Sequence, residues 1–153
     1  MMDSLPLFHS WPLYDAPGRL GFSDERGSLV ESVAALATAE MGVWSCDLAD
    51  DRLEWTGAVY RLFGLPEDEA IARDFALSRY VGGSRAAMET LRAHAIGHRR
   101  GFTMDALIVR ADGDKRWMRL SALPVVVDNK VVRLTGTKRD VTAQYDGPGW
   151  QRL

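Results

Sequence analysis

The sequence predicts an α+β fold built around an antiparallel sheet, and two turn signals and one short hairpin pattern carry that prediction. Asp112 and Gly113 separate two long apolar-rich runs, and a two-residue Asp-Gly loop suits the type I′ turn that joins antiparallel strands. Asp128 and Asn129 repeat this signal between the next two runs. Upstream, two short segments that each contain a tryptophan form another hairpin pattern. Strands are therefore expected over 42–48, 52–56, 102–111, 115–127 and 130–140.

The first 27 residues differ from the rest, because large apolar side chains alternate there with prolines and glycines. Too apolar for a solvated tail, residues 1–27 are expected to be an N-terminal extension that docks on a partner or on the protein's own sheet. Ser28 and Glu31 have the spacing of a capping box, which predicts a helix over 28–40. One side of that helix carries Leu29, Val33 and Leu36.

Further helical segments precede the last three strands. They are expected over 58–65, as short turns over 66–81, and as one longer helix over 85–99. The longer helix carries Met88, Leu91 and Ala95 at helical spacing, and Gly101 is expected to close it.

Size and composition indicate one domain of an ordinary globular protein. The chain has 153 residues, of which 46% are apolar and 26% charged, and it contains no run approaching the roughly 20 apolar residues that a membrane helix needs. The N-terminus has no secretion-signal pattern. A formal charge of −2 gives no general attraction to nucleic acid or to anionic membranes. The single cysteine, Cys46, excludes an internal disulfide and fits a cytoplasmic location.

Four motifs in a fixed order make the chain resemble the PAS family, and within it the PAS/PAC, PAS fold-3 subgroup. The opening Gly-x-Trp-x-x-Asp-Leu and Trp-Thr pattern is Gly42, Trp44, Asp47, Leu48, Trp55 and Thr56. The next helix of the family matches residues 58–65. The hairpin motif is Arg110, Asp112, Gly113, Arg116 and Trp117, and the closing motif is Gly136, Thr137, Asp140, Val141 and Thr142.

The resemblance spans residues 28–145, which defines the expected PAS domain and leaves 146–153 as a C-terminal tail. It departs from the family where a His-Pro-x-Asp turn usually stands, because this chain has Tyr80-Val-Gly-Gly-Ser-Arg85 there. The family's fold is a five-stranded antiparallel sheet in the order 2-1-5-4-3, flanked by short helices and one longer helix.

The resemblance also implies a function, namely a non-enzymatic sensory or regulatory module in bacterial-type cytoplasmic signal transduction. No phosphate-binding loop, kinase or cyclase signature, or nucleophile-base set occurs in the sequence. The short segment after Thr142 leaves no room for a coiled-coil linker, so the domain is expected to act through partners such as a kinase or a response regulator.

Strand alternation, combined with the resemblance, predicts which side chains line a ligand pocket between the sheet and the 85–99 helix. Any ligand is expected to be small and mostly apolar, and the alternative is that these side chains only fill a core. The predicted pocket residues are Trp44, Cys46, Met104, Ala106, Ile108, Met118, Leu120, Ala122 and Lys138.

No cofactor is predicted, and flavin binding, haem binding and an enzymatic function are the competing interpretations. Flavin-binding relatives use a cysteine in the helical region and amides on inner strands, whereas this chain has Ile108 and Met118 at those strand positions. A haem-based gas or redox sensor would use His94, four residues before His98 on one helical face. A small curved-sheet isomerase would need Asp47 or Asp105 as its base. No structural metal site is predicted.

Lys138 is the unexpected residue, since strand parity turns its stem inward and a buried unpaired ammonium is costly. Three interpretations are open. The side chain snorkels to the rim of the sheet, which is favoured, or pairs with a carboxylate such as Asp47, or meets an anionic ligand.

Asp140 and Thr142 match the motif through which PAS domains pass a signal out of the sheet, and local hydrogen bonds are expected to hold the exit of the chain there. A homodimer is predicted, with monomer formation as the alternative if the N-terminal extension folds back on its own sheet. The predicted interface residues are Trp11, Leu13, Leu29, Val33, Leu36, Trp117 and Leu123.

Overall fold

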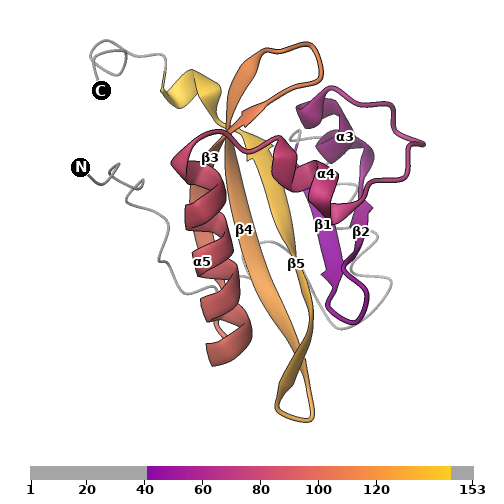
Figure 1. Ribbon diagram of the computed structural model, residues 1–153, viewed down its shortest axis with the longest axis vertical. Coiled ribbons are helices and arrows are strands. Elements are labelled where there is room, and N and C mark those ends of the chain that lie inside the picture. Colours follow the sequence, from indigo (N-terminus) through magenta and orange to yellow (C-terminus); the bar gives the residue numbers. More distant parts are fainter. Residues whose placement is uncertain (1–40, 146–153) are drawn as a thin grey trace.

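A computed structural model describes residues 41–145, which form an antiparallel sheet with helices on one face (Figure 1). The strands lie in the order β2-β1-β5-β4-β3, which confirms the predicted topology. Their bounds are β1 Gly42–Asp47, β2 Arg52–Trp55, β3 Phe102–Val109, β4 Lys115–Val127 and β5 Lys130–Asp140. The segments 1–27 and 146–153 and the predicted helix over 28–40 lie outside the described residues.

The helical layer consists of three helices that follow β2 along the chain. They are α3 Gly57–Phe63, α4 Arg73–Ser78 and α5 Gly83–His98. Figure 1 shows α5 crossing in front of β3 and β4, with α4 beside it in front of β5 and β1. A 3₁₀ turn, η1 Thr142–Gln144, follows the last strand.

The core lies between the sheet and this helical layer, and the alternation of the long strands builds it. Met104, Ala106 and Ile108 on β3 are fully buried, and Met118 and Ala122 on β4 are buried beside them. Because a side chain such as Ile108 or Met118 gains roughly 1.5–3 kcal/mol from full burial, a one-residue slip of either strand would be strongly disfavoured. The predicted inward parity of both strands is confirmed.

The two turn signals have different outcomes. Asp128 and Asn129 both have positive φ, at 51° and 64°, and they join the paired residues Val127 and Lys130 as a two-residue loop, as predicted. The Asp112-Gly113 turn is not of type I′, because only Gly113 has positive φ, at 89°.

The loop at Gly113 is instead a three-residue connection between Arg110 and Asp114. The amide of Gly113 donates to the carbonyl of Arg110 at 2.9 Å, and the amide of Arg110 donates to the carbonyl of Asp114 at 2.7 Å. This is the hydrogen bonding of a type I turn followed by a left-handed glycine. The carboxylate of Asp112 accepts a hydrogen bond from the amide of Asp114 at 2.9 Å. Asp112 therefore stabilises the turn through its side chain and not through a left-handed backbone conformation.

The end of α5 also differs from the prediction that Gly101 closes it. Arg99 takes the left-handed conformation, with φ 55° and ψ 44°, and its amide donates to the carbonyl of Ala95. The Arg99 guanidinium then donates to the carbonyl of Asn129 at 3.4 Å, a tertiary contact that helps a non-glycine residue tolerate this conformation.

Candidate functional site

A cavity of about 50 Å³ lies between the sheet and the helices α4 and α5. Four of the nine predicted pocket residues line it, namely Trp44, Cys46, Leu120 and Lys138. They come from β1, β4 and β5, the central strands of the sheet.

The other five predicted pocket residues are buried but do not line the cavity. Met104, Ala106 and Ile108 lie on β3, which packs directly under α5. Met118 and Ala122 lie on the adjacent strand and also belong to the core. Strand parity therefore identified the buried face, whereas the position of the cavity depends on where the helices leave space above it.

Nine further lining residues were not predicted, and most of them come from the helical layer. Met88 and Arg92 project from the same face of α5, four residues apart, so the helical period contained a signal for them. For the segment that forms α4 the sequence predicts only short helical turns. The remaining members are Leu53, Arg73, Ala76, Leu77, Tyr80, Phe102 and Leu134.

Lys138 lies inside an aromatic cage, so the interpretation that it snorkels to the rim is wrong. Its residue surface is only 6% exposed, and its Nζ lies 5.5 Å from the ring centre of Trp44, 5.1 Å from that of Trp55 and 5.2 Å from that of Phe63. These distances are within the range of cation–π attraction. The proposed pairing with Asp47 is also wrong, because that carboxylate faces Arg133 at 3.9 Å.

The ammonium of Lys138 has neither a hydrogen bond nor an ion pair with any residue in the range 41–145. Burial lowers its pKa from the usual 10.5 to about 7, and the electrostatic interaction with Cys46 opposes that shift. The faces of the three aromatic rings also favour the charged form. The side chain is therefore a cation that changes charge near neutral pH.

Two more polar groups face the cavity from its walls. Burial raises the pKa of the Cys46 thiol, against the opposing effect of nearby Arg92. Burial, and then the charge of Glu89, raises the pKa of Tyr80, so its hydroxyl keeps its proton. Among the described residues, the Tyr80 hydroxyl has no hydrogen-bond partner.

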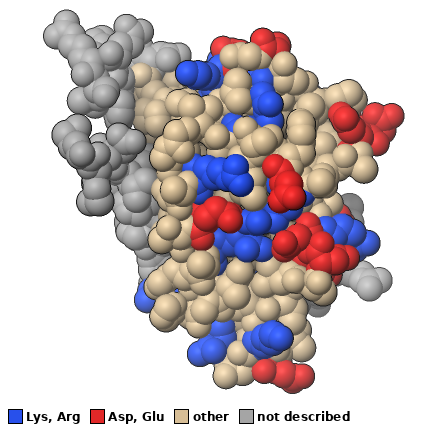
Figure 2. Space-filling view, in the orientation of Figure 1, with Lys and Arg blue, Asp and Glu red and all other residues tan. Residues whose placement is uncertain are grey.

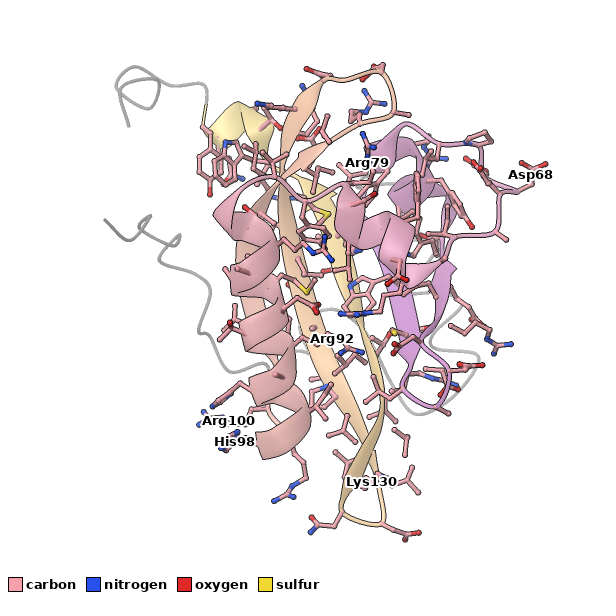
Figure 3. All side chains as sticks on the ribbon, viewed as in Figure 1. Asp68, Arg79, Arg92, His98, Arg100 and Lys130 are labelled. Carbon is pink, nitrogen blue, oxygen red and sulfur yellow. The ribbon has the colours of Figure 1, made fainter. Side chains whose placement is uncertain are left out.

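The two arginines of the cavity are each held by a carboxylate. Arg73 on α4 pairs with Glu89 on α5, and this ion pair ties the two helices together. Arg92 donates to Asp51, in the β1–β2 turn, at 3.2 Å. Figure 3 shows Arg92 lying between α5 and the sheet, whereas His98 and Arg100 point away at the end of that helix.

The residues of the alternative functions lie outside the cavity. His94 is exposed on α5 and stacks on His98, with ring centres 4.2 Å apart, so it is not placed to ligate a haem in the cavity. Asp47 accepts from the amide of Ala49 at 3.0 Å at the end of β1. Asp105 is buried on the opposite face of the sheet. Neither carboxylate is therefore placed as the base of an isomerase acting in the cavity.

Asp105 belongs to a polar cluster that holds the end of the domain. Arg119 donates to both of its carboxylate oxygens, at 2.8 and 3.0 Å, and the hydroxyl of Tyr145 donates to it as well. The ring of Tyr145 stacks on Trp117 with centres 4.5 Å apart. The segment after β5 is thereby fixed to the outer face of β3 and β4.

Asp140 and Thr142 bind this exit segment to the sheet. Asp140 accepts from the amide of Thr142 at 2.9 Å and from Arg116 at 2.8 Å, and Thr142 accepts from the amide of Trp117 at 2.9 Å. Burial alone would raise the pKa of Asp140, but the hydrogen bonds from Thr142 and Arg116 together hold it below its usual value.

The predicted interface residues fall into two groups. Trp11, Leu13, Leu29, Val33 and Leu36 lie outside the described residues. Trp117 and Leu123 are half-buried on β4. On the face shown in Figure 2, Lys and Arg side chains lie next to Asp and Glu side chains, so the described part of that face carries no uniform positive field of the kind that nucleic-acid binding uses.

Two general properties are clear for residues 41–145. None of their helices is long and apolar enough to cross a membrane. Nor do three or more of their His, Cys, Asp or Glu side chains gather in a way that could hold a metal ion.

Several solved structures are similar to this one, and the descriptions of three of them name a sensory protein, a sensor or a receptor. A sensory box histidine kinase/response regulator from Burkholderia thailandensis matches with a TM-score of 0.62 and 19% identity, over 78% of this chain and 87% of the other. The N-terminal domain of a diguanylate cyclase with a PAS/PAC sensor from Marinobacter aquaeolei matches with a TM-score of 0.63 and 16% identity, over 68% and 97%. An RNA-binding light-oxygen-voltage receptor matches with a TM-score of 0.63 and 13% identity, over 73% of this chain but only 32% of its own.

At these identities the structural matches show the fold alone, and the family rests on sequence. No curated protein matches the chain. The family model described as the PAS fold matches residues 52–138, which is more than half of the sequence and includes β2, β3, β4, most of β5 and the three helices of the described residues. The chain therefore belongs to the PAS fold family, whose domains are sensory modules of signal transduction.

Proposed function

We propose that this protein is a non-enzymatic sensory module that binds a small ligand in the cavity and reports it through the exit segment after β5. The cavity is the observation that carries this proposal. It is lined at once by the central strands and by α4 and α5, so an occupant would contact both layers of the fold. Lys138 supplies a charged group inside it that is unpaired among residues 41–145.

The route from cavity to exit is short. Lys138 and Asp140 are two residues apart on β5, and Lys138 pairs with Leu120 on the neighbouring strand β4. A displacement of β5 by a ligand would therefore reach the hydrogen bonds of Asp140 and Thr142 directly, through a single strand. This is a contiguous physical connection, and its coupling strength is what the experiments must measure.

The partner is proposed to be a signalling protein such as a kinase or a response regulator, and the location to be the cytoplasm of a bacterium. The similar structures described as parts of a histidine kinase/response regulator and a diguanylate cyclase support the class of partner. The unpaired thiol of Cys46 is compatible with a reducing compartment. A homodimer is proposed as well, with the N-terminal extension and the outer face of β4 at its interface.

A fragment panel, screened by amide NMR on the full chain, tests the cavity. Ala76 lines the cavity and is buried, so Ala76→Leu should fill it, whereas Ala93→Leu adds the same atoms on the exposed side of α5. We expect fragments that bind the wild type and Ala93→Leu to lose binding to Ala76→Leu. A panel in which every fragment leaves the signals of Trp44, Leu120 and Lys138 unmoved would refute the proposed ligand site.

A further inference from the structure

The polar side of the cavity consists of hydrogen-bond donors and positive charge. Lys138, Arg73 and Arg92 contribute three cations, and the hydroxyl of Tyr80 and the thiol of Cys46 contribute neutral donors. Among the described residues, no aspartate or glutamate lines the cavity. An occupant that satisfies these groups must therefore present acceptor oxygens.

Charge balance adds a stronger requirement than hydrogen bonding. Arg73 is balanced by Glu89, and Arg92 by Asp51, so one positive charge of the three remains uncompensated within residues 41–145. That charge is Lys138. The Lys138 residue is only 6% exposed, so its ammonium lacks most of its hydration, and the cost of burying its charge is reduced when a counter-ion contacts it.

We propose that the cavity binds a small monocarboxylate, with its carboxylate held by the ammonium of Lys138 and its short apolar body against the aliphatic wall. This inference rests on the proposed function and specifies its ligand class. Tyr80 also lines the cavity, and we assign its hydroxyl as a second donor to the carboxylate. Leu53, Ala76, Met88 and Leu134 provide the aliphatic wall.

The volume of the cavity limits how large the ligand can be. A volume of about 50 Å³ accommodates roughly three or four water-sized groups, which corresponds to a short-chain acid and excludes a flavin or a haem without rearrangement. A dicarboxylate would bring a second negative charge, and the other two cations that line the cavity, Arg73 and Arg92, are already paired with Glu89 and Asp51. The ligand is therefore expected to carry one carboxylate.

Binding should depend on pH through Lys138. Cys46 on β1 interacts electrostatically with Lys138, and the other titratable or charged groups around the cavity are Asp51 in the β1–β2 turn, Arg73 on α4, Tyr80 after α4, and Glu89 and Arg92 on α5. Burial raises the pKa values of Cys46 and Tyr80, so both groups stay neutral near pH 7. Deprotonation of Lys138 near its pKa of about 7 removes the charge that the ligand needs. Affinity is thus expected to fall as the pH rises above 7.

Isothermal titration of the full chain with propionate and with propionamide tests the inference, in a buffer free of carboxylates. The two probes have nearly the same shape and differ in charge. At pH 6.5 we expect propionate to bind at least about tenfold more tightly than propionamide, the ratio that one favourable buried charge contact supplies. Between pH 6.5 and 8.5 the affinity for propionate should fall roughly tenfold or more, while propionate itself stays ionised.

Variants assign the effect to the cavity. Lys138→Met should abolish the preference for propionate, and Tyr80→Phe, which removes a single oxygen, should weaken propionate binding severalfold. Lys130→Met is the matched control, because Lys130 is an exposed lysine on the same strand (Figure 3), and it should bind propionate as the wild type does. If Lys138→Met does not fold, the propionate affinity of Tyr80→Phe and the pH dependence of the wild type still test the carboxylate assignment.

The outcomes separate this inference from the proposed function. Equal binding of propionate and propionamide, or propionate binding that survives Lys138→Met, overturns the carboxylate assignment and leaves a ligand cavity in place. If fragments bind but propionate does not, the carboxylate assignment is likewise wrong and the ligand cavity is kept. If neither the probes nor any fragment binds, both the inference and the proposed function are wrong.

Discussion

At the scale of single residues, Lys138 shows which properties of a side chain the alternation of a strand can predict and which it cannot. The period of two placed its stem on the inner face, because that parity is a local property of β5. Its surroundings could not be derived in the same way, since the rings that enclose its ammonium come from β1, β2 and α3. The three rings meet only in the tertiary fold. The strand pattern alone does not place them around Lys138, so it favours the rim position.

The burial of Lys138 predicts an unusual stability profile. Its pKa falls from 10.5 to about 7 on folding, so the unfolded chain binds more protons between those values and stability should rise with pH across that window. At about 1.4 kcal/mol per pKa unit, the cost at pH 7 is roughly 4 kcal/mol, of which cation–π contacts return about 2 kcal/mol at most. Lys138→Met should therefore raise the unfolding free energy by about 1–3 kcal/mol at pH 6.5, and the gain should shrink by pH 8.5.

Urea denaturation of the wild type, Lys138→Met and Lys130→Met at both pH values measures this, in the absence of carboxylates. The Lys130→Met control should stay within about 0.5 kcal/mol of the wild type, as surface substitutions usually do. A Lys138→Met variant less stable than the wild type at pH 6.5 would contradict the description of an uncompensated buried charge.

Gly136 gives a second prediction at this scale, because β4 passes unusually close to it. A Cβ at this position would lie 1.8 Å from the carbonyl oxygen of Ser121, a backbone atom that cannot move alone. Gly136→Ala should lower the unfolding free energy by about 1–3 kcal/mol or more through overpacking. Gly97→Ala is the control, since a Cβ there meets no atom of the described residues within 4 Å, and it should stabilise α5 by about 0.5–1 kcal/mol. Thermal unfolding compares the two, and equal midpoints would contradict this account.

At the scale of elements, hairpins were predictable where the turn signal was complete and less so where a side chain altered it. Asp128 and Asn129 both adopt left-handed conformations and produce the expected two-residue loop. At Asp112 the carboxylate binds a nearby amide, and the loop lengthens to end on Gly113. The cavity could not be predicted for a related reason, because it depends on α4, a six-residue helix without a strong periodic pattern.

The attachment of the exit segment to the sheet can be tested by removing a single hydroxyl, that of Thr142. The Thr142 side chain accepts the amide hydrogen of Trp117, which joins η1 to β4. Thr142→Val keeps the shape but removes the acceptor, so it should lower the unfolding free energy by about 1 kcal/mol and speed amide exchange at Trp117. Thr142→Ser, which keeps the acceptor, should protect that amide as the wild type does. Slow exchange at Trp117 in Thr142→Val would rule out this role of Thr142.

At the scale of the whole molecule, the order of the strands followed from a resemblance and the assembly state remains a prediction. The hairpin of β4 and β5 exposes Val125, Val126, Val127 and Val132, an apolar group available to a second subunit or another partner. Sedimentation of the full chain against a version lacking residues 1–27 tests the dimer. We expect a dimeric mass for the full chain and a lower mass for the shortened one, whereas an unchanged monomeric mass for both would refute the dimer.

The central claim is that occupancy of the cavity changes the exit segment, and amide hydrogen exchange of the full chain measures it most directly. Exchange is recorded with and without saturating amounts of a fragment that binds the wild type but not Ala76→Leu, and the latter variant serves as the control. We expect slower exchange in the cavity walls on β1, β5 and α5, together with altered exchange across Asp140–Tyr145. Protection confined to the cavity walls, with Asp140–Tyr145 unchanged, would contradict it.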